Sequence, residues 1–169
     1  MRIGRAAALI FLPLMIAGCY SSKLPLIPAG KAVFPYQKIV YQEPGATNAT
    51  TFVHEGNAYV SQTEQGDHVQ MLFMPLKDNL YVVQVGGNVD GNGKVVYLYG
   101  LLKLDLPNKM AASYVAVADK SDIGPGLPAC TDADSTICLT DLKPYLDHAL
   151  ALMAAGAEPM TTYKLLDLE

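Results

Sequence analysis

The feature that most limits the possible folds is a series of short, β-prone runs separated by tight turns. Valine, leucine, tyrosine and phenylalanine gather at residues 68–76, 79–87 and 94–106, with brief polar or glycine-rich breaks between them. Gly56-Asn57 divides an earlier run at residues 50–64 in the same way. Because these spacings are short, the strands are expected to pair in sequence order as an antiparallel meander.

The central strands have hydrophobic side chains at both alternating positions. This holds for the run Tyr81-Val82-Val83-Gln84-Val85 and for residues 95–101. A sheet with one solvated face alternates more cleanly. We therefore expect both faces to be covered, either by closure into a barrel or by a packed helix. Gly100, inside the second run, indicates a bend or a bulge.

The C-terminal third changes to a helical period. Apolar side chains recur at helical spacing at Leu142, Tyr145, Leu146, Ala149, Leu150 and Met153. Thr140 or Asp141 can cap the start of this helix, and Gly156 fits its end. The sequence of residues 160–168 then predicts a final strand. The expected fold is α+β and mainly antiparallel β: a meander of about six strands, as a curved sheet or small barrel, with one C-terminal helix and a final short strand.

The N-terminus has the pattern of an export signal. Residues 1–5 are positively charged, and residues 6–17 form a run of 12 apolar residues that contains Pro13. A membrane-spanning helix needs about 20 such residues. A charged end followed by a short apolar run and small residues is typical of a secretory signal peptide.

The apolar run ends in Ile16-Ala17-Gly18-Cys19. This resembles the lipobox of bacterial lipoproteins. The resemblance implies cleavage between Gly18 and Cys19 and a diacylglycerol, with fatty acid such as palmitate, on Cys19. Two or three acyl chains bind a membrane durably where one is marginal. The alternative is a chance cysteine after an ordinary signal or within a buried N-terminal helix.

The resemblance also implies an organisation of the chain. Residues 1–18 are removed, residues 19–30 form a lipidated N-terminus and tether, and residues 31–169 form a single β-rich globular domain. Serine, proline and glycine favour a linker over residues 20–29. Tyr20 follows the lipobox cysteine where Gram-negative lipoproteins of the inner membrane tend to have Asp, so the expected location is the outer membrane. The mature part looks like the uncharacterised envelope lipoproteins of Gram-negative bacteria.

The other two cysteines, Cys130 and Cys138, are expected to form a disulfide. Export to an oxidising compartment favours this pairing. The bridge would close a nine-residue loop and add about 2.5 kcal/mol in the chain-entropy model. One C-x₇-C pair is a poor zinc site, and a redox-active pair is more often C-x-x-C.

The sequence predicts no catalytic, cofactor-binding or metal-binding residue. His54 is expected on an exposed hairpin, His68 at a solvated turn and His148 on or near the surface of the C-terminal helix. Residues 88–93 mimic half of a calcium loop but lack its final carboxylate, so a hairpin turn is favoured. Tyr81, Tyr97 and Tyr99 are expected in the core or at its rim rather than around a ligand cavity.

Charge and composition narrow the function. The formal net charge is −4 and becomes more negative when the signal, with both arginines, is removed. This gives no footprint for nucleic acid and no polybasic patch for anionic lipid. The leading hypothesis is a membrane-anchored, non-enzymatic envelope lipoprotein with a binding or structural role toward another envelope protein or peptidoglycan. The alternatives are a carrier or sensor of an apolar ligand, an inhibitor of a lytic enzyme, or an enzyme that uses a histidine.

Overall fold

The computed structural model describes residues 20–62, 68–88, 95–114, 126–128 and 137–169. Within these residues the elements are β1 (Tyr20–Ser22), η1 (Ala29–Lys31), β2 (Lys38–Gln42), β3 (Thr50–Glu55), β4 (Ala58–Gln62), β5 (His68–Lys77), β6 (Leu80–Asn88), β7 (Val95–Asp105), β8 (Met110–Tyr114), β9 (Ile137–Cys138), α1 (Leu142–Ala154) and β10 (Thr161–Leu168).

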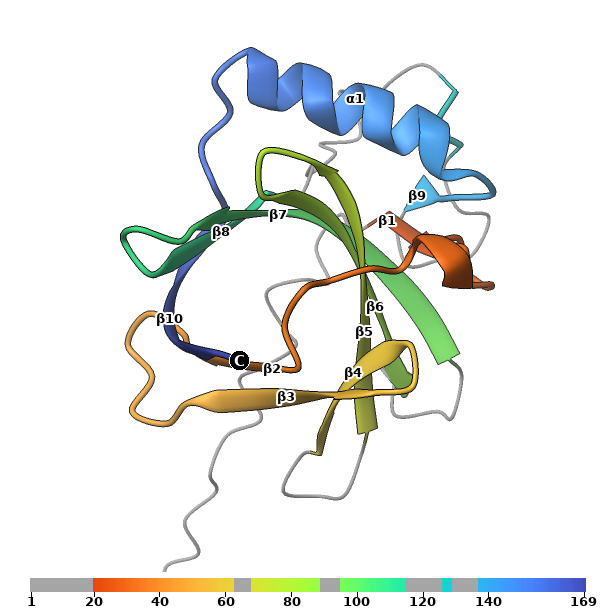
Figure 1. Ribbon diagram of the computed structural model, residues 1–169. Coiled ribbons are helices and arrows are strands. Elements are labelled where there is room, and N and C mark those ends of the chain that lie inside the picture. The colour runs from red at the N-terminus through yellow and green to blue at the C-terminus, as the bar shows by residue number, and fades with distance from the viewer. Residues whose placement is uncertain (1–19, 63–67, 89–94, 115–125, 129–136) are drawn as a thin grey trace, which may run out of the picture.

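Eight strands close into an antiparallel barrel (Figure 1). Its circular order is β2-β3-β4-β5-β6-β7-β8-β10, and β10 returns to β2. The predicted fold class is therefore confirmed, and the sheet closes rather than staying open. The meander from β2 to β8 has seven strands rather than about six, and two short strands, β1 and β9, extend the sheet beside β7.

Two hairpin turns show why the strands pair in sequence order. Gly56, between β3 and β4, has a φ of 67°, which glycine adopts at little cost. Asp78 and Asn79, between β5 and β6, have φ values of 50° and 59°. Two consecutive residues of positive φ match the twist of the flanking strands. Both predicted hairpins are present.

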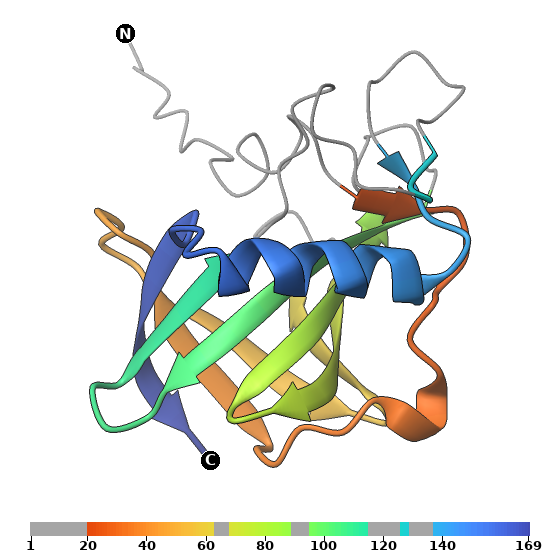
Figure 2. The same cartoon turned by 90° about the horizontal axis from the view of Figure 1, so that it is seen from above.

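Strand β6 is buried on both faces. Tyr81 and Val83 belong to the cluster inside the barrel, whereas Leu80 and Val82 belong to the cluster between the barrel wall and α1. Figure 2 shows α1 lying across the outside of this wall. The two coverings that the sequence left as alternatives therefore occur together.

Helix α1 begins and ends as predicted. The Asp141 side chain accepts a hydrogen bond from the Lys143 amide, which caps the first turn. At the other end, the Gly156 amide donates to Met153 O and the Ala157 amide to Leu152 O. This pair of bonds, with Gly156 at a φ of 87°, is the Schellman arrangement.

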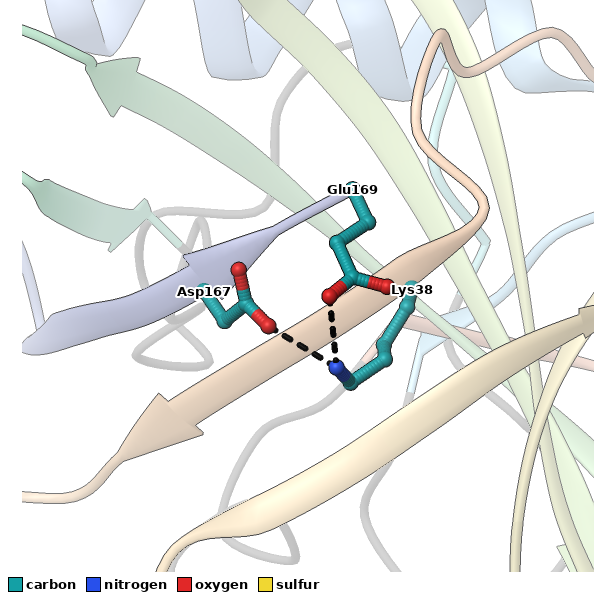
Figure 3. Close-up of polar contacts among 3 residues, drawn as sticks. All are labelled: Lys38, Asp167 and Glu169. Carbon is teal, nitrogen blue, oxygen red and sulfur yellow. Dashed lines mark hydrogen bonds and ion pairs between the residues drawn. The ribbon is translucent and has the colours of Figure 1, made fainter.

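The barrel seam between β2 and β10 carries an ion-pair cluster (Figure 3). Lys38 Nζ lies 2.8 Å from Asp167 Oδ2 and 3.1 Å from Glu169 Oε1. The hydrogen bond from Lys38 lowers the pKa of Asp167. A bulge between Leu165 and Asp167 lets Leu165 point into the barrel core while Asp167 reaches Lys38 outside.

The prediction of a linker over residues 20–29 is wrong. Tyr20 to Ser22 form β1, which pairs antiparallel with β7 and parallel with β9. Tyr20 is 0% exposed and Ile27 is 3% exposed. Their side chains cover the outer faces of β6 and β7 that α1 leaves open, so this segment belongs to the globular body.

Residues 32–37, between η1 and β2, pack against the core of the barrel. The Phe34 ring stacks on Phe73 at 4.4 Å and meets Tyr81 at 4.9 Å between ring centroids. The Tyr59 hydroxyl donates to the carbonyls of Phe34 and Tyr36. The side chains of this segment therefore extend the barrel core before β2 begins.

Candidate functional site

The predicted cleavage and acylation site and one of the two predicted disulfide cysteines lie outside the part of the chain that the structure describes. Gly18, Cys19 and Cys130 are outside the described residues, so cleavage, acylation and the Cys130–Cys138 pairing stay predictions. Cys138 is described: it lies in β9, opposite Ser21 of β1. It is disulfide-bonded, and its partner lies outside the described residues.

The chain immediately after Cys19 is bound into a buried cluster that we call the N-terminal junction. It consists of Tyr20, Ser22, Gln84, Tyr99 and Tyr145. These residues bring β1 together with β6, β7 and α1, and each is at most 5% exposed. In Figure 1, β1 and β9 lie beside the N-terminal end of α1.

The apolar half of the junction is a group of tyrosine rings. Tyr20 and Tyr145 are both 0% exposed, and their ring centroids are 4.8 Å apart in a tilted arrangement. The Tyr99 ring is 6.3 Å from that of Tyr145. Tilted aromatic pairs at such distances stabilise beyond their burial alone. Helix α1 therefore packs on the barrel both directly, beside Tyr99 of β7, and through Tyr20 of β1.

The polar half of the junction is a hydrogen-bond network around Gln84. Gln84 Oε1 accepts from the amides of Leu26 at 2.9 Å and Ile27 at 3.1 Å. It also lies 3.1 Å from the Tyr99 hydroxyl, which is 2.8 Å from Ser22 Oγ. Burial raises the pKa of Tyr99, so the hydroxyl stays neutral. The network fastens residues 22–27 to the barrel wall.

The sequence carries a signal for one part of the junction, Gln84, but none for its other parts. Gln84 is a polar residue inside a strand whose two faces were expected to be covered, and a buried polar group needs partners. Those partners are backbone amides of Leu26 and Ile27, which no composition rule identifies. Tyr20 lies in a strand of three residues, too short for any periodicity to show.

Alkaline pH is expected to weaken the fold through Tyr20. Burial raises the pKa of Tyr20 to about 12, from 10.0. The folded protein therefore keeps a proton that the unfolded chain loses above pH 10. The resulting stability, about 2–3 kcal/mol, is complete below pH 10 and lost as pH rises toward 12.

Tyr20→Phe is expected to remove the share of this pH dependence that comes from Tyr20, so the variant should lose less stability than the original protein between pH 8 and 11.5. At pH 8 it should leave stability nearly unchanged, because the hydroxyl has no hydrogen-bond partner among the described residues. Urea midpoints of both proteins at pH 8, 10 and 11.5 make the comparison. Parallel losses in the two proteins would contradict a buried, neutral Tyr20.

The histidines are not brought together. His54, in β3, is half-buried, with Nδ1 3.3 Å from Gln37 Oε1 and its ring beside Tyr59. His148, in α1, is half-buried, and its Nε2 has no hydrogen-bond partner among the described residues. His68 begins β5, and its side chain lies outside the described set. Among the described residues, no three His, Cys, Asp or Glu side chains form a metal-binding group.

An open pocket of about 390 Å³ runs along the solvent side of α1. It is lined by Asp141, Lys143, Pro144, Asp147, His148 and Ala151. Lys143 Nζ lies 2.6 Å from Asp147 Oδ2, which satisfies both charges within the helix surface. The arrangement is that of a solvated helix face with an i,i+4 ion pair.

The three tyrosines considered as a ligand-binding face separate onto two faces. Tyr81 lies inside the barrel against Phe34 and Phe73, while Tyr99 belongs to the junction outside. Tyr97 lies opposite Gly86, and a Cβ at Gly86 would come within 2.8 Å of the Tyr97 ring. All three side chains thus pack against neighbours of the fold.

The fold and the junction define the protein as an eight-stranded antiparallel barrel joined to one outer helix through its N-terminal strand. Comparison with protein-family models, with curated proteins and with solved structures finds no match to this chain. In the described part of the chain, the helix is too short and too polar to cross a bilayer.

Proposed function

We propose that this chain is a membrane-anchored envelope lipoprotein, acylated on Cys19, with a non-enzymatic binding or structural role. The observation that carries the proposal is the motif Ile16-Ala17-Gly18-Cys19 at the end of a short apolar run with a charged start. In proteins with this motif, the thiol of the cysteine is the group that receives lipid.

The position of β1 supports a cut before Cys19. Cleavage there leaves Tyr20 to Ser22 intact, with their pairing to β7 and β9. A cut even a few residues further along would remove Tyr20, which is fully buried. The globular body therefore accommodates the lipoprotein cleavage point and would be damaged by a later one.

The role proposed for the barrel is recognition of another envelope component, a protein or peptidoglycan, at the outer membrane. The barrel interior is packed with side chains such as Phe52, Phe73 and Tyr81, and His54 and His148 belong to different walls of the molecule. These features support a body that acts through its surface.

Replacement of the lipobox cysteine tests the proposal. Cys19→Ser is expected to abolish labelling by a clickable palmitate analogue and to move the protein from the membrane pellet to the soluble fraction, because no acyl chain remains. Cys130→Ser is the matched control, since it removes a cysteine that is expected in a disulfide rather than under lipid, and it should leave both labelling and pelleting intact. Labelling that persists in Cys19→Ser would refute the proposal.

A further inference from the structure

Two strongly exposed apolar side chains lie on the β1 side of the barrel, beyond the end of β1 that is farther from the proposed anchor. Leu24 is 71% exposed and Val95 is 51% exposed. In the antiparallel β1–β7 ladder, Ser22 is paired with Tyr97. Leu24 lies two residues beyond Ser22 and Val95 two residues before Tyr97, so both leave the ladder at the same end. We call Leu24 and Val95 the anchor-side patch.

The chain between Cys19 and this patch has little freedom. Tyr20 follows Cys19 directly, is 0% exposed and is paired on both sides. Consecutive Cα atoms are about 3.8 Å apart, so the Cα of Leu24 lies within about 19 Å of that of Cys19. After Ser22, the bonds from the amides of Leu26 and Ile27 to Gln84 hold the chain against the barrel.

From these observations we propose that the anchor-side patch rests on the surface of the bilayer that holds the acyl chains. This inference depends on the acylation of Cys19 proposed above. An anchor without a flexible linker keeps the β1 side of the barrel at the membrane, where Leu24 and Val95 lose their contact with water. In the circular strand order, β3 is four strands from β7 in both directions and so faces away from the membrane.

Single tryptophans measure this orientation, because the chain contains none. Leu24→Trp replaces an exposed residue of the patch, and Val53→Trp replaces a 44% exposed residue on β3 as its matched control. Both acylated proteins are reconstituted in vesicles of phosphatidylethanolamine and phosphatidylglycerol, with and without lipid brominated near the headgroup. Circular dichroism melts confirm that each variant is folded.

We expect brominated lipid to quench Leu24→Trp about two-fold or more, because interfacial side chains lie about 5–10 Å into the headgroup region. Val53→Trp should be unaffected. Equal quenching of the two tryptophans in membrane-bound, acylated protein would overturn the inference while leaving the anchor in place. If mass spectrometry shows no acyl chain on Cys19, the proposed function fails and the inference fails with it.

A separate experiment tests the direct connection between Cys19 and Tyr20. Ten glycine and serine residues inserted between Cys19 and Tyr20 would span about 17 Å on average and release the barrel from the surface. The acylated protein should stay in the pellet, but quenching of Leu24→Trp should fall to the level of Val53→Trp. Unchanged quenching would overturn the claim that the direct connection sets the orientation.

Discussion

A protein that begins at residue 31 is expected to lose most of its stability, whereas one that begins at residue 20 is expected to fold. The shorter chain lacks Tyr20 and Ile27, which are 0% and 3% exposed. Burial of two such side chains contributes about 3–6 kcal/mol. Since a domain is typically stable by only about 5–15 kcal/mol, this loss brings it close to unfolding.

Urea denaturation followed by circular dichroism compares residues 20–169 with residues 31–169. The matched control is Leu24→Ser in the longer protein, because Leu24 belongs to the same segment but is 71% exposed, and its midpoint should hardly move. Equal midpoints for the two lengths would show that the N-terminal segment is a tether after all.

Gln84→Leu is expected to destabilise the protein by about 2–4 kcal/mol, although leucine is apolar and of similar size. The change removes the acceptor for the amides of Leu26 and Ile27 and a partner of the Tyr99 hydroxyl. Gln84 is 2% exposed, so water cannot readily replace the lost acceptor.

The control for this experiment is Gln70→Leu in β5, an exposed glutamine in the same sheet, which should shift stability by less than about 0.5 kcal/mol. Chemical denaturation at pH 7 measures both. In addition, Gln84→Leu should speed proteolysis within residues 22–28, because this segment loses its fastening. A variant as stable and as resistant as the original protein would show that the network contributes no stability.

The strands and the helix were predictable because their signals are local. Apolar residues on both faces of residues 81–85 indicated two coverings, and Asp141 and Gly156 marked the ends of α1. The closure of the barrel was left open as an alternative to a curved sheet. Closure depends on β10, which comes after the helix and inserts between β8 and β2, and no local pattern states which strands a distant strand will pair with.

The candidate site likewise has one part that can be predicted from the sequence and one part that cannot. The proposed lipobox is a contiguous four-residue motif, so it is visible in the sequence. The N-terminal junction joins Tyr20 with Gln84, Tyr99 and Tyr145, each more than sixty positions from Tyr20, and becomes visible only when the barrel is closed. The error over residues 20–29 has the same cause: serine and proline describe how the segment behaves alone, not what it covers.

The sequence by itself determined the fold class, the hairpins and the helix, because hydrophobic periodicity, turn residues and caps act between near neighbours. Only the tertiary structure decided that the chain after Cys19 is a strand rather than a tether. Helix α1 leaves part of the apolar outer face of β6 and β7 uncovered, and the side chains of Tyr20 and Ile27 pack against that part. That packing gives the proposed anchor a fixed position on the barrel.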